Sequence, residues 1–212
     1  MKKWLIVFII VSIILFVVIL ANSDVIKNFL SGRTVFTLQA GGNIYYVDNT
    51  CSTSGTGLSQ ICGATGPIIT IQAAINNANL AAGDTIRIRA TGTNYVTPTV
   101  TTGIAGTAAS PITVTSYTGS LTNPVWTRSS GITMLNANHA YWIFDGIDFV
   151  ATADNIDIVV VSGNNNAFRN CAFIEGGTSL NIVDTADNLV VDNCIFDRNG
   201  GGTDHSITTG RI

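Results

Sequence analysis

Three hexapeptides in the second half of the chain nearly repeat one another: Phe144-Asp-Gly-Ile-Asp-Phe149, Phe168-Arg-Asn-Cys-Ala-Phe173 and Val191-Asp-Asn-Cys-Ile-Phe196. Their starts lie 24 and 23 residues apart. A second apolar track has nearly the same interval, because Ile132, Ile156 and Leu180 are spaced 24 residues apart. Two apolar tracks with one period predict a solenoid, in which the chain coils on itself and each turn stacks on the turn before.

The composition of the repeats predicts strands rather than helices. The repeats consist of Val, Ile, Phe and Thr, and Asn, Asp or Gly interrupts them every few residues. They contain no helical stretch and lack the leucine frame of leucine-rich repeats, whose period is similar. The expected fold is therefore all-β, a parallel β-helix.

Equivalent residues of such a coil stack on neighbouring turns at the strand spacing of about 4.8 Å. We expect two inward columns: Phe149, Phe173 and Phe196 in one, and Ile147, Cys171 and Cys194 in the other. Asn170 and Asn193 fall at the corner between two strands, where Asn tolerates the left-handed conformation and can bond its own backbone.

The amino terminus predicts export. Lys2 and Lys3 precede an apolar run, residues 4–21, which as a helix would be about 27 Å long, nearly the thickness of a bilayer core. Ala21-Asn22-Ser23 is an acceptable cleavage site. Residues 1–23 are therefore a signal peptide or, if uncleaved, a signal anchor in the membrane. Both alternatives place the rest outside the cytoplasm, secreted or anchored to the cell membrane, because the lysines stay inside.

The rest of the chain is interpreted as a linker, residues 24–42, and one β-helix domain, residues 43–212. Residues 206–209 look like the first strand of another turn, so we expect the domain to be C-terminally incomplete and the sequence to be a fragment. Charged residues make up 11% of the chain, with a net charge of −3, and no basic cluster could follow a phosphate backbone. Nucleic acid is therefore not expected as a partner.

The four cysteines form two pairs of different kinds. Cys51 and Cys62 flank a loop rich in Ser, Thr and Gly, and a disulfide that closes it would contribute about 3 kcal/mol, so we expect this disulfide. Cys171 and Cys194 lie one turn apart, near enough to bond. Buried free thiols are the more usual outcome. Neither pair has the spacing or the nearby His of a metal site, so we assign no metal.

One stretch, residues 70–78, has helical periodicity. Thr70 suits the N-cap, and the apolar residues fall on one face: Ile71, Ala74, Ile75 and Ala78. We expect a short helix that caps the open end of the coil, where apolar side chains and strand edges would otherwise be exposed.

The order of five motifs resembles the opening of secreted right-handed β-helix proteins of the pectate-lyase-like superfamily: Tyr45-Tyr-Val-Asp48, Thr70-Ile-Gln-Ala-Ala-Ile75, Gly83-Asp-Thr-Ile86, Gly92-Thr-Asn-Tyr95 and Ser110-Pro-Ile-Thr-Val114. Within it, the pattern is similar to the amino-terminal part of alginate-lyase, chondroitinase-B-like and family 9 pectate-lyase proteins. The resemblance covers about residues 43–212. It implies a right-handed, single-stranded parallel β-helix with a short N-terminal capping helix.

The resemblance also implies a chemistry: acidic polysaccharide or another surface glycan as partner, often calcium, and a Lys or Arg base that removes the C5 proton of a uronate. No lysine follows Lys27, so a lysine base has no counterpart here. The remaining candidates are Arg87, Arg89, Arg128, Arg169, Arg198 and Arg211. The residues themselves assign no cofactor, and calcium is implied by the resemblance alone.

The register predicts one charged column. Asp145, Arg169 and Asp192 occupy the same position on three successive turns and should point outward. As candidate substrate-binding residues, they would recognise sugar carboxylates through Arg169. As a surface ion-pair ladder, the more usual outcome, they would contribute at most about 1 kcal/mol per pair.

Other polar and aromatic residues give weaker signals. The carboxylate pairs Asp154 with Asp157 and Asp184 with Asp187 offer too few oxygens for calcium, and residues 199–204 resemble half of a calcium-binding turn. The single histidines, His139 and His205, have no visible Ser or Cys partner, so they do not indicate a nucleophilic triad. Three aromatic residues could stack on sugars or be buried in the core: Trp126, Tyr141 and Trp142.

These observations lead to one expected function and one alternative. The expected function is an exported β-helix domain that binds or cleaves acidic polysaccharide, with the active residues beyond this fragment. If the protein is an enzyme, a polysaccharide lyase acting by β-elimination is favoured over a glycoside hydrolase. The alternative is a non-catalytic cell-surface adhesin or structural solenoid, and the sequence leaves open whether the protein is an enzyme.

Overall fold

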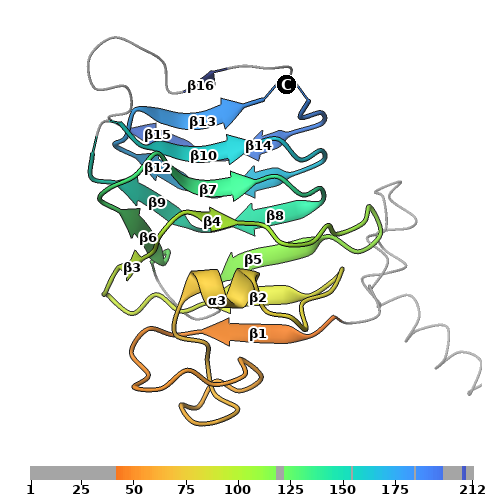
Figure 1. Ribbon diagram of the computed structural model, residues 1–212, viewed down its shortest axis with the longest axis vertical. Coiled ribbons are helices and arrows are strands. Elements are labelled where there is room, and N and C mark those ends of the chain that lie inside the picture. The colour runs from red at the N-terminus through yellow and green to blue at the C-terminus, as the bar shows by residue number, and fades with distance from the viewer. Residues whose placement is uncertain (1–41, 118–121, 154, 184, 198–206, 209–212) are drawn as a thin grey trace, which may run out of the picture. The chain divides into compact units, whose positions relative to one another are not determined.

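Parallel strands wind into a solenoid with three sheets (Figure 1). This computed structural model describes residues 42–117, 122–153, 155–183, 185–197 and 207–208. From β2 onward, each turn contributes one strand to each sheet in the same order, so strands three apart in the sequence pair with one another, whereas β1 pairs directly with β2. The all-β parallel coil predicted from the repeats is confirmed.

The three sheets run along the coil. Sheet A contains β1 (Ile44–Val47), β2 (Thr85–Ile88), β5 (Ile112–Ser116), β8 (Trp142–Asp145), β11 (Ala167–Arg169) and β14 (Val190–Asp192). Sheet B contains β3 (Tyr95–Val96), β6 (Val125–Arg128), β9 (Asp148–Ala151), β12 (Ala172–Ile174) and β15 (Ile195–Asp197). Sheet C contains β4 (Val100–Thr101), β7 (Thr133–Ala137), β10 (Asp157–Val161), β13 (Thr178–Ile182) and β16 (Ile207–Thr208).

The predicted phenylalanine column is confirmed and forms the centre of the core. Phe173 pairs in register with Phe149 and Phe196, at ring-centroid distances of 5.4 and 5.0 Å with planes 8° apart. A second stack, Phe144 on Phe168, lies at 5.1 Å. The two stacks meet edge to face at 5.8 to 6.3 Å, a favourable aromatic arrangement. The stacked turns therefore interlock through their side chains as well as their backbones.

The predicted track of Ile132, Ile156 and Leu180 is wrong. Asp157 pairs with Thr133 and with Thr178, so the period of sheet C falls from 24 to 21 residues. Leu180 consequently lies over Val159, and Ile132 is 76% exposed. The corner between β12 and β13 is shorter than the corner between β9 and β10, and this difference shifts the register.

The predicted Asn corner is confirmed, with different hydrogen bonds. Asn170 and Asn193 have φ angles of 51° and 50°, in the left-handed region, one turn after Gly146 at 69°. The Asn193 side chain donates to Oδ1 of Asn170 at 2.7 Å, and the Asn170 side chain donates to Oδ1 of Asp145 at 2.7 Å. These amides therefore link neighbouring turns instead of bonding their own backbone.

A second left-handed corner, which the sequence analysis missed, precedes strands β8, β11 and β14. Its residues are Tyr141, Asn165 and Asn188, with φ angles of 60°, 57° and 57°. Asn is common in this conformation, and Asn188 again donates to Oδ1 of Asn165, at 3.2 Å. Tyr141 is the exception, because a bulky side chain in the left-handed region costs about 1–2 kcal/mol.

The predicted helix forms but is short. Helix α3 (Ile71–Ile75) has the Thr70 hydroxyl as its N-cap and buries Ile71, Ala74 and Ile75. It ends before Ala78, which is exposed. The Asn77 side chain accepts the backbone N–H two residues later at 2.9 Å, and such local bonds compete with helix continuation.

The edge of the first strand is covered by the cysteine loop, residues 51–68, whereas the sequence analysis assigned the capping role to the helix. Tyr46 N–H donates to the Gly57 carbonyl at 2.8 Å, Ile68 N–H donates to the Tyr46 carbonyl at 2.8 Å, and Asp48 N–H donates to the Ile68 carbonyl at 2.9 Å. Helix α3 packs beside β4, β1 and β2 and lies below β4 in Figure 1.

The predicted disulfide and the predicted free thiols are confirmed. Cys51 and Cys62 form the expected disulfide, with Cα atoms 5.5 Å apart, and Cys171 and Cys194 are free thiols. Within the part of the chain that the structure describes, no helix has the length and apolar character needed to span a bilayer. Several predicted features lie outside the described residues: the segment 1–23, nearly all of the linker, Asp154, Asp184, Arg198, residues 199–204, His205 and Arg211.

Tyr141→Asn should increase the free energy of unfolding by about 1 kcal/mol, because Asn relieves the left-handed strain that Tyr carries. Asn165→Ala, at the equivalent position one turn later, should lower it by about 1 kcal/mol, because Ala tolerates this conformation poorly and cannot accept from Asn188. Urea unfolding followed by circular dichroism measures both. Destabilisation by Tyr141→Asn would show that the Tyr141 backbone is not strained.

Candidate functional site

The predicted charged column is in register on sheet A. Arg169 pairs with Asp145 on one side and with Asp192 on the other, next to the inward-facing Phe168. Asp145 accepts a hydrogen bond from the Asn170 amide, and no ion pair joins Arg169 to either carboxylate among the described residues. The role of this column in binding sugar carboxylates stays a prediction.

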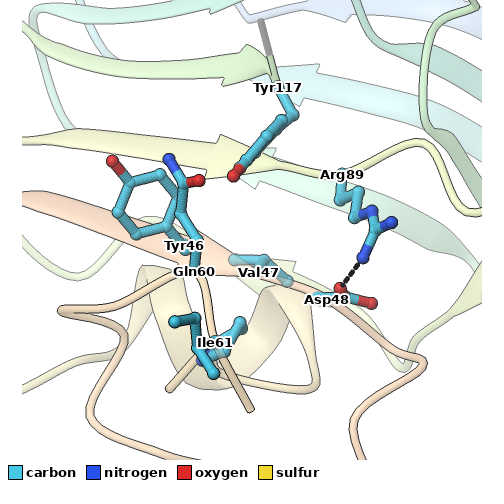
Figure 2. Close-up of a pocket in the computed structure, with 8 residues that line it drawn as sticks. Tyr46, Val47, Asp48, Gln60, Ile61, Arg89 and Tyr117 are labelled. Carbon is cyan, nitrogen blue, oxygen red and sulfur yellow. Dashed lines mark hydrogen bonds and ion pairs between the residues drawn. The ribbon is translucent and has the colours of Figure 1, made fainter. Parts of the chain in front are cut away.

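A cavity of about 280 Å³ lies at the β1 end of the coil, against the outer face of sheet A (Figure 2). Strand β1 and the residues that follow β2 and β5 line one side, and the cysteine loop lines the other. The lining residues are Tyr46, Val47, Asp48, Gln60, Ile61, Pro67, Arg89 and Tyr117. Of these, only Arg89 was a functional candidate from the sequence, as one of six arginines, whereas Tyr46, Val47 and Asp48 belonged to a motif of the family resemblance.

Strand alternation explains why these side chains meet. Tyr46 faces outward because its neighbours Tyr45 and Val47 are buried, and it pairs in register with Arg87 on β2. The ladder continues past the strand ends, where Arg89 N–H donates to the Val47 carbonyl at 3.0 Å and Tyr117 N–H donates to the Ile88 carbonyl at 2.7 Å. Outward positions on three consecutive turns therefore converge at the cavity.

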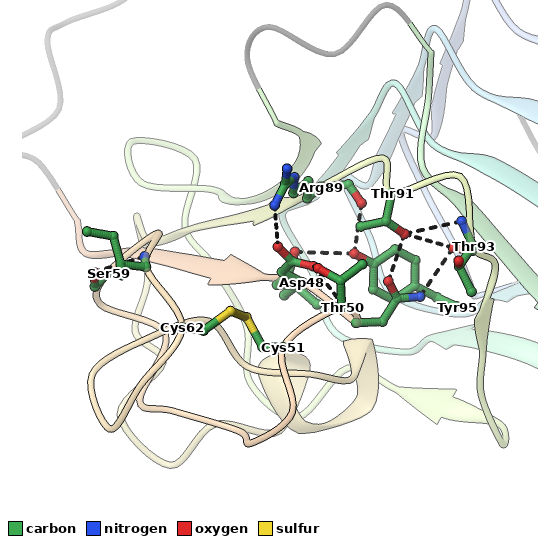
Figure 3. Close-up of polar contacts among 12 residues, drawn as sticks. Asp48, Thr50, Cys51, Ser59, Cys62, Arg89, Thr91, Thr93 and Tyr95 are labelled. Atoms are coloured by element: carbon green, nitrogen blue, oxygen red, sulfur yellow. Dashed lines mark hydrogen bonds and ion pairs between the residues drawn. A yellow bond between two sulfur atoms is a disulfide. The ribbon is translucent and has the colours of Figure 1, made fainter.

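Asp48 and Arg89 form an ion pair at 2.8 Å, with Asp48 buried and the Arg89 side chain 55% exposed. Burial opposes ionisation of Asp48. The backbone N–H and the hydroxyl of Thr50 donate to Oδ1 of Asp48 at 2.9 and 2.6 Å. These hydrogen bonds and the Arg89 guanidinium together outweigh the effect of burial, so the pKa of Asp48 falls below its ordinary value of 3.8. Figure 3 shows both partners of Asp48: Thr50, in the segment after β1, and Arg89, directly after β2. Asp48 is thus an ionised anchor that holds Arg89 at the cavity.

A hydrogen-bonded segment after β2 supports Arg89 from behind (Figure 3). The Tyr95 hydroxyl donates to the Arg89 carbonyl at 2.7 Å, and burial raises the pKa of Tyr95 to about 12, so it stays a donor at neutral pH. Thr91 donates to Asn49 Oδ1 at 2.7 Å, which links this segment to the chain after β1. The guanidinium is therefore carried by an ordered backbone.

Two tyrosine rings and Arg89 line the cavity, and Arg87 lies beside it, in register with Tyr46. The Tyr46 and Tyr117 rings lie 5.7 Å apart at 60°. Burial raises the pKa of Tyr117, and the nearby Tyr46 raises it further. The positive charges of Arg89 and Arg87 lower the same pKa, so both guanidinium groups act on the Tyr117 hydroxyl. Nε of Arg87 is buried and has no hydrogen-bond partner among the described residues. The arrangement can hold an anion next to an aromatic surface.

Several other sequence candidates do not join this site. Trp126 and Trp142 are fully buried, and their indole N–H groups donate to Thr97 Oγ1 at 2.6 Å and to the Ile104 carbonyl at 2.7 Å, so they belong to the core. His139 Nδ1 lies 2.9 Å from Oδ1 of the neighbouring Asn. In the described ranges, no three His, Cys, Asp or Glu side chains are grouped so that they could hold a metal ion such as calcium.

Comparisons with known proteins show the fold. No family model and no curated protein matches the sequence. The chain superposes on pectate lyase Pel9A with a TM-score of 0.58 and 22% identity, over 73% of this chain and 39% of that one. A rhamnogalacturonan lyase gives 0.52 and 15%, over 74% and 51%. An alginate lyase from Paenibacillus sp. str. FPU-7 gives 0.42 and 16%, over 74% and 67%.

These likenesses show that the chain has a pectate-lyase-like parallel β-helix fold, as the five motifs indicated. The chain spans about two fifths of the pectate lyase and about half of the rhamnogalacturonan lyase. At these identities the likeness concerns the fold alone.

Asp48→Asn should lower the free energy of unfolding by about 1–2 kcal/mol near neutral pH, because it removes the charged acceptor of Thr50 and Arg89. The pKa of Asp48 is depressed in the folded state, so its contribution is present above the ordinary value of 3.8 and is lost as the pH falls below it. Urea unfolding between about pH 7 and pH 2 should show the two proteins converging in stability at the acid end. A constant difference across this range would contradict the assignment.

Proposed function

We propose that this chain is an exported β-helix domain that binds acidic polysaccharide in the cavity on sheet A. One observation carries the proposal: two tyrosine rings and Arg89 line a cavity of about 280 Å³, and Arg87 lies beside it in register with Tyr46. The structural likeness to a pectate lyase and a rhamnogalacturonan lyase supports a carbohydrate-active domain in general.

The chemistry of the cavity suits a uronate. A sugar presents apolar C–H faces, which pack on aromatic rings, and a uronate adds a carboxylate, which suits the planar fork of a guanidinium. Arg89 gives one N–H group to Asp48, and its side chain is more than half exposed, so other donors can reach a ligand. Arg87, in register with Tyr46, adds a second positive charge beside the cavity.

Cleavage is a separate proposal, carried over from the resemblance. β-Elimination requires a cation on the uronate carboxylate and a base on the C5 proton. We place these groups outside the described residues, as the resemblance implies, and ascribe binding alone to the cavity. The right-handed winding is likewise proposed; the strong preference for right-handed crossovers between parallel strands supports it.

Export is supported by two independent features. Lys2 and Lys3 precede the apolar run 4–21, and Cys51 and Cys62 form a disulfide, which persists in oxidising compartments. The full chain, expressed in a bacterium and fractionated, should be found outside the cytoplasm with this pair oxidised, as judged by alkylation and mass spectrometry. Cytoplasmic protein with both thiols alkylated would contradict export.

Tyr117→Ala and Arg87→Gln should each weaken binding of oligogalacturonate about tenfold, because an aromatic contact and a charged hydrogen bond are each worth about 1.5 kcal/mol. Isothermal titration calorimetry of the full chain measures the affinity. Arg128→Gln is the matched control, because it removes the same charge from β6 in sheet B and should leave the affinity unchanged.

The same titrations include alginate and chondroitin oligosaccharides, and absorbance near 235 nm reports any unsaturated product. Failure to bind any acidic glycan would refute the proposed function and favour a structural solenoid. Equal losses from Arg87→Gln and Arg128→Gln would show that net charge, and not the cavity, determines binding.

A further inference from the structure

We propose that the cavity takes the terminal sugar of an acidic glycan rather than an internal segment, an inference that rests on the proposed function. Three features of the described residues support it: a fixed wall at one side, the small size of the cavity, and an uneven distribution of charge along sheet A.

The cysteine loop closes the outer face of sheet A at β1. Gln60, Ile61 and Pro67 of the loop line the cavity, and Figure 2 shows Gln60 beside Tyr46 and Ile61 below β1. The loop is fixed by the Cys51–Cys62 disulfide and by its backbone bonds to β1. A glycan lying along the coil would therefore be blocked at its β1 end.

The size of the cavity limits what it can enclose. About 280 Å³ is at or just below the lower end of the range of about 300–1,000 Å³ that is typical of small-molecule sites. The Tyr46 and Tyr117 rings lie 5.7 Å apart, so a sugar can pack against them but not between them. One sugar residue fits such a volume, and several consecutive residues do not.

The charges on sheet A favour an anion at the β1 end only. Arg87 and Arg89 are there, and the neighbouring carboxylate, Asp48, is buried and already bound by Arg89 and Thr50. Three turns farther along the coil the balance reverses, because Arg169 lies between Asp145 and Asp192. An acidic chain extending along this face would meet an excess of negative charge, whereas a chain end in the cavity would not.

The test compares oligogalacturonates of increasing length, with each end modified in turn, by calorimetry on the full chain. If a chain end is bound, affinity per chain should change less than about threefold beyond the shortest oligomers, and modification of one particular end should weaken binding at least about tenfold. Affinity that rises with the number of residues and is insensitive to both modifications would overturn the inference. Failure of every oligomer to bind would refute the proposed function itself.

Two variants test the same idea from the protein side. Ile61→Ala removes a side chain of the wall that is 79% exposed, so folding should be unaffected, and it should improve binding of long chains relative to short ones. Asp192→Asn should improve binding of long chains and leave the shortest oligomers unchanged, because only a chain lying along sheet A approaches this carboxylate. Equal effects on all lengths from both variants would contradict recognition of a chain end.

Discussion

The structure depends on the register between successive turns. Each strand pairs with the equivalent strand one turn away, so any side chain on the outer or inner face lies directly over its counterpart. The two interlocked phenylalanine stacks satisfy this constraint inside the coil, and the left-handed Asn corners satisfy it at the turns. Register also sets what the surface can do, because it brings Tyr46, Arg87 and the residues that follow β2 and β5 to one place on sheet A.

The first turn creates the candidate site because it is irregular. Among the residues that the structure describes, no strand precedes β1, and without a partner its edge would expose unpaired backbone groups. The disulfide-closed loop supplies those hydrogen bonds through Gly57 and Ile68, and in doing so it stands beside the outer face of the sheet. The same loop that protects the edge therefore provides one wall of the cavity. Stability and the proposed binding share a structural cause at this end of the coil.

The sequence predicts the regular part of this structure well and its irregular part poorly. Phe149, Phe173 and Phe196 could be aligned because their spacing is nearly constant, and Asn170 and Asn193 mark a corner that few residues tolerate. The alignment of Ile132 with Leu180 failed because one corner is shorter, which no local pattern signals. Likewise, Tyr46, Arg89 and Tyr117 are far apart in the sequence, and only the register and the folded loop bring them together. A pattern search could have paired Tyr46 with Arg87 once the strands 44–47 and 85–88 were aligned, but the wall from the cysteine loop has no sequence period.

A crystal structure of the protein with a short galacturonate oligosaccharide tests the account most directly. We predict electron density for one terminal sugar in the cavity, packed against Tyr46 and Tyr117 with its carboxylate at Arg89. Density for the glycan on sheet B or sheet C, with an empty cavity on sheet A, would contradict the central claim.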